Sequence, residues 1–322
     1  MGNKKLDKTP NSINEKLFEF AEFDDEAAKR AGYSNYSYWR STWQVFTKNK
    51  IAVFLLGLIV ILLTFTLIQP YIPNQKLPTK IYIDEGTKMQ LRNHPPDSEF
   101  WFGTNSIGQD LWARIWSGTR TSLLIGIVVS LWEAAAGIII GALWGYVRRL
   151  DRAITEIYNV INNIPTTIIL ILLTYIMRPS LTTMIFAMCM TGWLGMARFV
   201  RNLIVIIRDR EYNLASRCLG TPTRRIVTRN LLPYLVSVIM LRMALAIPGA
   251  IGYEVFLTYI GLGLPVSIPS LGNLINEGRA LMMVPSLRYQ LIFPAIVLSV
   301  ITISFYVMGN VFADAADPRN HV

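Results

Sequence analysis

Apolar runs of about 20 residues each dominate this sequence and restrict the structures it can form. A helix rises 1.5 Å per residue, so a run of this length spans the ~30 Å hydrocarbon core of a bilayer. In lipid every backbone polar group must be paired inside the protein, which favours helices. The sequence therefore predicts an all-α polytopic membrane protein with six transmembrane helices.

The apolar runs also divide the chain into segments. We expect a cytoplasmic N-terminal tail (1–50), a first transmembrane helix (51–72), an extracytoplasmic segment (73–118), a helical core (119–312) containing a cytoplasmic loop (207–233), and a cytoplasmic C-terminal tail (313–322). Within the core, the predicted spans cover about 119–147, 154–177, 181–206, 234–262 and 291–311.

Basic residues are clustered along the chain, which carries a net charge of +10 although only 16% of its residues are charged. Nine Lys or Arg residues precede Ile51, and eight more lie between Arg198 and Arg229. These clusters alternate with the apolar runs as the positive-inside rule requires, so both termini are expected in the cytoplasm. The basic charge thus indicates membrane topology and not a nucleic-acid surface.

The sequence offers little for catalysis or for ligand binding by this chain. Its two cysteines, Cys189 and Cys218, lie in different segments, and its two histidines are His94 and His321. A G-x-x-x-x-G-K-[ST] phosphate loop is absent from the sequence. We expect no enzymatic activity, no metal site and no cofactor in this chain.

The polar connector between the fourth and fifth predicted spans carries a helix stop followed by a helix start. Gly220 ends a stretch of good helix formers, where a left-handed residue is favoured. Thr221 and Pro222 follow as the expected N-cap and first-turn proline of a new helix. Ala215 and Ser216 give the first helix a slim face, which suits it to lie in a groove of a partner protein.

Small residues recur every four positions in the second predicted span, at Gly137, Gly141 and Gly145. Such a face lets two membrane helices approach closely. We interpret it as packing within the helix bundle in preference to a direct role in transport.

Other residues inside the predicted spans leave two interpretations open. Pro165, Pro248 and Gly249 break the backbone hydrogen-bond ladder, either at a water-filled path or at a simple kink. Ionisable residues at membrane depth either form structural salt bridges or line a pathway, and here they are Glu133, Arg242 and Glu254. They are too sparse for a proton relay.

Four ordered motifs resemble those of a known family. They are FGTNSIGQDLWARIWSGTRTSLLIG (102–126), YEVFLTYIGLGLP (253–265), PSLGNLINEGR (269–279) and ADAADPR (313–319). They are similar to motifs of the oligopeptide permease C type, a permease subunit of bacterial oligopeptide/dipeptide ABC importers. The connector is also similar to the loop by which such permeases dock on their ATPase, with Ala215, Gly220, Ile226, Leu232 and Pro233 in the order of the family's EAA, Gly, Ile and LP signature.

The chain departs from the family pattern at several positions. Leu214 replaces the Glu of the EAA signature and Ser216 its second Ala. Glu211, three residues earlier, lies on the same helix face as Leu214 and can present a carboxylate there. Elsewhere Asn105 and Gln109 replace an Asp and an Arg, and Asn310 replaces an Asp.

The resemblance implies the type I ABC-importer permease fold, with 119–312 as the permease core and 207–233 as the coupling loop. Residues implied to contact the ATPase are Glu211, Tyr212, Asn213, Leu214, Ala215, Ser216, Arg217, Cys218, Leu219, Gly220 and Thr221. Candidates for the translocation path are Ala246, Pro248, Gly249, Ala250 and Gly252, in a mostly uncharged segment between Arg242 and Glu254.

The same resemblance implies a peptide importer in the bacterial cell membrane. Its other components would be a homologous second permease, two cytoplasmic ATPases that bind ATP and Mg²⁺, and an extracytoplasmic peptide-binding protein. Two alternatives stay open: a permease of the same class for nickel or another small solute, and an ion-driven secondary transporter. Inverted repeats with broken helices, expected of the latter, are not evident in the sequence.

Overall fold

The computed structural model describes residues 38–86 and 88–316. The chain forms two compact units, Met1–Ser41 and Thr42–Val322. Most of the predicted N-terminal tail and the end of the predicted C-terminal tail therefore lie outside the described residues.

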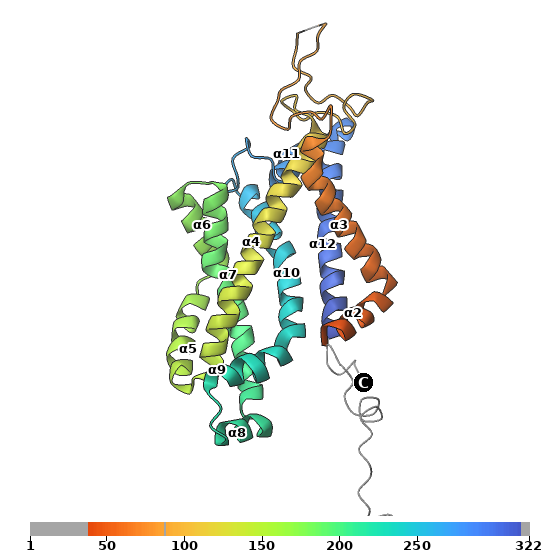
Figure 1. Ribbon diagram of the computed structural model, residues 1–322. Coiled ribbons are helices and arrows are strands. Elements are labelled where there is room, and N and C mark those ends of the chain that lie inside the picture. Colours follow the sequence, from red (N-terminus) through yellow and green to blue (C-terminus); the bar gives the residue numbers. More distant parts are fainter. Residues whose placement is uncertain (1–37, 87, 317–322) are drawn as a thin grey trace, which may run out of the picture. The chain divides into compact units, whose positions relative to one another are not determined.

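The described part of the chain is helical (Figure 1). Its α-helices are α2 (Tyr38–Lys48), α3 (Lys50–Ile68), α4 (Leu111–Tyr146), α5 (Arg148–Asn162), α6 (Thr166–Met177), α7 (Leu181–Arg208), α8 (Glu211–Cys218), α9 (Thr223–Arg225), α10 (Leu232–Tyr259), α11 (Leu271–Ala280) and α12 (Tyr289–Ala316). Two 3₁₀ turns, η2 (Gln69–Tyr71) and η4 (Pro285–Leu287), and a π-helix, η3 (Ile226–Leu231), complete it. Extended pairing in the described residues is limited to isolated bridges, such as Ile81 with Gln109.

Five of the described helices are long and apolar enough to cross a membrane, namely α3, α4, α7, α10 and α12. The predicted span at 154–177 is instead divided between α5 and α6, which are bent by 73°. Pro165 lies at the break, where it lacks an N–H and restricts the preceding residue to extended conformations. The bent pair returns the chain from the α8 end of the bundle to the α11 end, so the described residues contain five candidate spans, or six if the pair is counted as one (Figure 1).

The glycine face of α4 packs directly on α7. A Cβ atom added at Gly137 would lie 2.5 Å from Met196 Cβ, and one added at Gly145 would lie 2.8 Å from the carbonyl oxygen of Arg201. Neither distance leaves room for a side chain. The prediction that these glycines serve helix packing is confirmed.

The remaining spans pack around α10, which contacts both α4 and α12, while α3 contacts α12 (Figure 1). Toward the α8 end, the buried core includes Ile204 and Ile226. Toward the α11 end, Ile251, Leu271 and Ile301 form part of a second cluster. Apolar burial of this kind fixes the two ends of α10 against its neighbours.

The segment between α3 and α4 covers the α11 end of the bundle and is held by polar contacts (Figure 1). The hydroxyl of Tyr289, at the start of α12, lies 3.0 Å from the carbonyl oxygen of His94 and 2.8 Å from that of Thr104. The ammonium of Lys76 lies 2.9 Å from the ring centroid of Phe100, a cation–π contact. This segment is therefore part of the folded structure and not a free loop.

Candidate coupling corner, transport cavity and outer clasp

Helix α8 ends in a Schellman motif centred on Gly220. Gly220 has φ of +75°, its N–H donates to the carbonyl of Arg217 at 2.9 Å, and the N–H of Thr221 donates to the carbonyl of Ser216 at 3.0 Å. The predicted left-handed glycine is confirmed. The next helix begins one residue later than predicted, with Pro222 at the N-cap position, because the carbonyl of Pro222 accepts the first hydrogen bonds of that helix, from the N–H groups of Arg225 at 2.9 Å and Ile226 at 3.2 Å.

The inner face of α8 is tied to the bundle by side-chain hydrogen bonds. The buried Asn213 amide donates to the carbonyl of Ile207 at 2.9 Å, and the Asn230 amide donates to Asn213 Oδ1 at 3.3 Å. The Arg217 guanidinium donates to the carbonyl of Arg208 at 2.7 Å. Helix α8 is thereby attached to both α7 and the segment that leads into α10.

The outer face of α8 carries most of the predicted coupling residues. Asn213 is buried and Ser216, Arg217 and Thr221 are half-buried, whereas the exposed ones are Glu211, Tyr212, Leu214, Ala215, Cys218, Leu219 and Gly220. Leu214 and Leu219 are 44% and 85% exposed, so apolar side chains face away from the chain at this corner. Exposed apolar groups on a polar loop are typical of an interaction surface.

Asp209 braces the corner and was not singled out by the sequence. Its carboxylate lies 3.3 Å from Arg148 Nη2, 3.2 Å from Arg208 Nε and 3.6 Å from Arg217 Nη2. Burial opposes ionisation, but the hydrogen bond from Arg208 and the three positive charges prevail and lower the pKa of Asp209. The signal available in the sequence was an acid placed directly between Arg208 and Arg210 in an Arg-rich connector.

The π-helix η3 lies directly before the LP pair of the family signature, and sequence reasoning did not predict it. Ile226 and Leu231, at its two ends, are fully buried. A proline within a helix lacks an N–H donor and clashes with the carbonyl four residues earlier. A wider π turn ahead of Pro233 relieves that clash, so helical structure runs from Thr223 through to Tyr259.

Two adjoining cavities lie among α4, α7 and α10. One has a volume of about 250 Å³ and extends to the break between α5 and α6, and the other has a volume of about 190 Å³. Glu133, Gly192 and Gly195 line both. Of the predicted path residues, Ala250 lines the larger cavity and Ala246 the smaller.

The other predicted path residues take different positions on α10. Pro248 lies inside the helix, which continues through it, so the predicted break of the ladder does not end the helix. Gly249 and Gly252 are exposed, and a Cβ atom added at either would meet nothing within 4 Å. Ala250 is only 5% exposed and belongs to an apolar cluster with Leu170. The open face of α10 is therefore the face of its glycines.

The three ionisable residues at membrane depth have distinct surroundings. Glu254 is fully buried and accepts a hydrogen bond from the hydroxyl of Ser122 at 2.9 Å. The guanidinium carbon of Arg242 lies 4.6 Å from the ring centroid of Phe199. Within the described residues, the carboxylate of Glu133 has no hydrogen-bond or ion-pair partner. Arg242 and Glu254 do not pair with each other, because they are twelve residues and so about 18 Å apart along α10.

Three of the sequence motifs meet near α11, in a cluster of Arg114, Ser122, Glu254, Leu271 and Glu277 that we call the outer clasp. Ser122, which contacts Glu254, also accepts a hydrogen bond from the backbone N–H of Leu271 at 3.1 Å. Nearby, the fully buried guanidinium of Arg114 donates to Glu277 Oε1 at 2.8 Å. Burial raises the pKa of Glu277, although Arg114 and the amide of Asn105 oppose the rise. Residues far apart in sequence thus join α4, α10 and α11.

The substitutions at Asn105 and Gln109 are explained by this clasp. Asn105 Nδ2 donates to Gln109 Oε1 at 3.1 Å, and the Gln109 oxygen also accepts from Arg114. An amide pair therefore stands where the family pattern has an acid and a base. The family's acid and base carry opposite charges that cancel, and the amide pair carries none. The net charge of this buried site is therefore the same as in the family pattern.

The described structure is thus a bundle of apolar helices, long enough to span a membrane, with the exposed helix α8 at one end and a hydrogen-bonded polar cluster at the other. Residues 137–322 match the family model of the binding-protein-dependent transport system inner membrane component, and residues 37–96 match that of the N-terminal TM domain of oligopeptide transport permease C.

Two permease proteins are similar to this chain over nearly its whole length. The chain is 39% identical over 314 residues to the oligopeptide transport system permease protein AmiD of Streptococcus pneumoniae, covering 97% of this chain and 99% of the relative. It is 33% identical over 310 residues to the dipeptide transport system permease protein DppC of Bacillus subtilis, covering 96% and 94%. A solved structure, the MetNI methionine ABC transporter in inward-facing conformations, matches with 20% identity and a TM-score of 0.49 over 63% of this chain and 96% of that chain.

The chain belongs to the family of binding-protein-dependent transport system inner membrane components. It is a multi-pass membrane protein and a permease subunit of an ABC importer. Membership in this family implies ATPase and substrate-binding partners.

Proposed function

We propose that this chain is one of two different permease subunits of an ATP-driven peptide importer, forming half of the translocation path. The peptide substrate is suggested by the relatives, which are named as oligopeptide and dipeptide permeases. The observation that carries the mechanism is the α8 corner, whose apolar outer face is exposed while its inner face is fastened to α7 and η3.

In this proposal residues 211–221 lie in a groove of one of two cytoplasmic ATPases, which bind ATP and Mg²⁺. Closure of the ATPases moves α8, and its attachments carry that motion to α7 and α10. The spans then switch between inward- and outward-facing states, a two-state element biased by differential binding. An extracytoplasmic peptide-binding protein delivers the cargo to the outer end.

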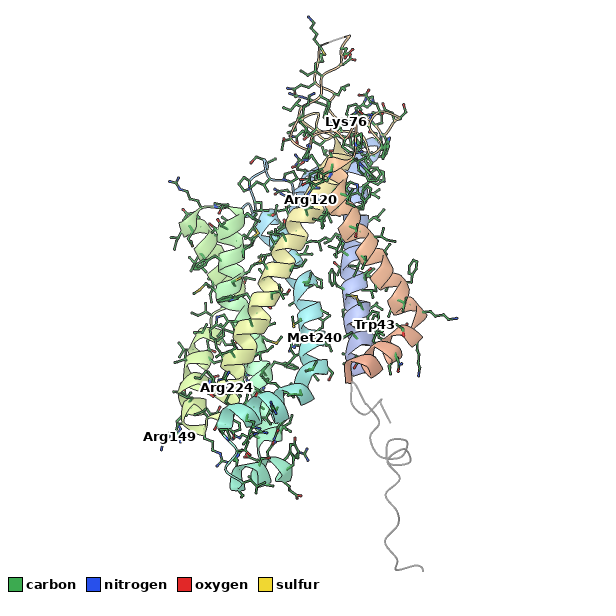
Figure 2. The ribbon with its side chains drawn as sticks, in the orientation of Figure 1. Trp43, Lys76, Arg120, Arg149, Arg224 and Met240 are labelled. Carbon is green, nitrogen blue, oxygen red and sulfur yellow. The ribbon has the colours of Figure 1, made fainter. Side chains whose placement is uncertain are left out.

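The proposed orientation in the bacterial cell membrane places the α8 end and both termini in the cytoplasm. Figure 2 shows Arg149 and Arg224 at the α8 end of the bundle and Lys76 at the opposite end. Arginines concentrated at one end support a cytoplasmic assignment for it. The segment of Lys76 would then lie outside, within reach of a binding protein.

The decisive test is purification of the complex through this chain, identification of its partners, and uptake assays in proteoliposomes. We expect copurification of a second permease and two ATPases, and ATP-dependent uptake of labelled short peptides. Uptake of nickel or another small solute in place of peptides would change the substrate class. Uptake driven by an ion gradient without an ATPase would contradict the proposal altogether.

A further inference from the structure

The carboxylate of Glu133 lies inside a membrane span without a partner in the described part of the chain. The side chain is half-buried on α4, 13 residues and so about 20 Å from the helix end at Tyr146. A Cβ atom added at Gly192 of α7 would collide with Glu133 Oε1, so the carboxylate is seated against the glycine backbone. An unpaired charge at this depth is costly, and such residues usually serve a function.

The surroundings of Glu133 form a cavity and not a packed interior. Glu133 lines both the larger cavity, which is also lined by Tyr253, and the smaller one, which is also lined by Arg242 and Ala246. Along α10 these lining residues fall on one face, because they are separated by four and seven residues. The carboxylate on α4 therefore borders two cavities that are also lined by Ala246 and Ala250 of α10, two of the candidates for the translocation path.

Arg242 lines the same cavity but is differently placed. Its guanidinium already has a partner, the ring of Phe199, and its side chain is exposed. No ion pair joins it to Glu133 among the described residues. Of the two charged groups, Glu133 is thus the one that has neither a ring contact nor a polar partner among the described residues.

We infer that Glu133 is a transient binding site for a primary ammonium group of the cargo, above all the free amino terminus of a transported peptide. This inference rests on the proposed function. A carboxylate is acceptor-only and forms its strongest hydrogen bonds with charged donors such as an ammonium. The cavity volumes, below the ~300 Å³ of typical small-molecule sites, fit the end of a peptide and not the whole of it.

Arg242 gives this site a means of release. A guanidinium on the same cavity as Glu133 repels an ammonium held there, because like charges repel each other. The repulsion lowers affinity for the cargo without removing its recognition. A path with one acid and one base can therefore sort peptides by their amino terminus and still let them pass.

The test uses the complete importer in proteoliposomes, with two lysine-free peptides of identical sequence, one with a free amino terminus and one N-acetylated. Uptake per assembled complex is compared between wild type and Glu133→Gln, below saturation. The wild-type and variant complexes use the same binding protein. Its own preference therefore cancels in the ratio of wild-type to variant uptake, which is calculated for each peptide separately. We expect roughly tenfold lower uptake of the free-amine peptide by the variant, which corresponds to about 1.4 kcal/mol, and unchanged uptake of the acetylated one.

Further variants separate recognition from packing. Glu133→Asp keeps the charge and should keep more of the free-amine preference than Glu133→Gln. Glu156→Gln, which alters an exposed carboxylate on α5, should change nothing. An acetylated peptide with one lysine shows whether a side-chain ammonium is also accepted, and loss of its uptake in Glu133→Gln would support recognition of ammonium groups in general.

Two outcomes overturn the inference alone: equal loss of uptake for the free and acetylated peptides, or failure of Glu133→Gln to assemble, which would assign the carboxylate to packing. Absence of any peptide uptake by the wild-type complex would instead refute the proposed function, and the inference with it. The two failures are therefore distinguishable.

Discussion

Arg114 is a fully buried cation, and its neighbours at the outer clasp determine what that burial costs. Its guanidinium contacts Glu277 and Gln109, and Glu277 Oε2 lies 3.4 Å from Asn105 Nδ2. Removing one partner of a buried pair leaves an uncompensated charge, which costs more than the pair itself contributes. The clasp is therefore more sensitive to one change than to a matched pair of changes.

We predict that Glu277→Ala lowers the free energy of unfolding by about 3 kcal/mol or more, because it removes both the negative charge and the acceptor oxygens that Glu277 offers to the buried Arg114. Glu277→Gln keeps one acceptor for Arg114 and should cost roughly 1 kcal/mol, the scale of one hydrogen bond. The double variant Arg114→Met with Glu277→Leu should recover most of the loss. Thermal unfolding of the detergent-purified protein measures all three, and equal loss in the Ala and Gln variants would contradict this account.

The pH dependence of the clasp follows from the raised pKa of Glu277. A carboxyl group whose pKa is higher in the folded than in the unfolded state binds its proton more tightly when folded. Stability should therefore rise as the pH falls from above the folded pKa to below it, and this contribution is lost as the pH rises. Unfolding temperatures across that range should vary less in Glu277→Gln than in wild type. An unchanged pH profile in the variant would show that Glu277 does not carry the effect.

Contacts of single residues were the least predictable part of this molecule. Glu254 was recognised from its depth in a span, but its partner Ser122 lies 132 residues away in sequence. Likewise Arg114 and Glu277 are separated by 163 residues. Periodicity and capping patterns carry local information only, so they cannot identify such pairs.

At the level of elements, local signals predicted most but not all of the structure. The end of α8 at Gly220 followed from glycine conformation, and the apolar runs located α3, α4, α7, α10 and α12. Prolines were ambiguous because their effect depends on context. Pro165 separates two helices, Pro248 is tolerated inside one, and Pro233 follows a π turn.

The conformation of Gly220 makes the coupling corner testable. With φ of +75°, this position costs a non-glycine residue about 1 kcal/mol or more, and a branched side chain suffers most. Gly220→Val should leave the protein in the membrane but abolish peptide-stimulated ATP hydrolysis by the assembled complex. ATPase assays in proteoliposomes measure this.

A matched control for that variant is Gly57→Val on α3, where an added Cβ atom also meets nothing within 4 Å but φ is not left-handed. It should retain peptide-stimulated hydrolysis. Normal stimulation and transport in Gly220→Val would remove α8 from the coupling mechanism.

At the level of the whole molecule, orientation in the membrane is the first quantity to measure. Single cysteines at Asp97 and Arg224, in a variant without Cys189 and Cys218, should react differently with a membrane-impermeant thiol reagent on intact cells. Asp97→Cys should be labelled and Arg224→Cys should not. Labelling of both, or of Arg224→Cys alone, is incompatible with the proposed orientation.

The open face of α10 allows a test of the translocation path. Gly252 is exposed with free space around it, whereas Ala250 is packed in an apolar cluster. Gly252→Leu should therefore reduce uptake of long peptides more than that of short ones, with normal assembly. Ala250→Leu should fill part of the 250 Å³ cavity and affect assembly more than length preference. Equal loss for all lengths in Gly252→Leu would place this face outside the path.

The outer clasp has a mechanical consequence. The outer clasp holds α10 at Glu254. In the proposed function the other end of α10, which begins at Leu232, is moved by the ATPases through α8. Leu232 lies 22 residues, or about 33 Å, from Glu254 along α10. The helix can therefore tilt as a rigid rod about the point where Glu254 holds it. A tilt of about 10° around that point would displace the α8 end by about 6 Å while moving the clasp hardly at all. A large displacement of the α8 end by the ATPases would thus need only a small rotation of α10 near the outer clasp.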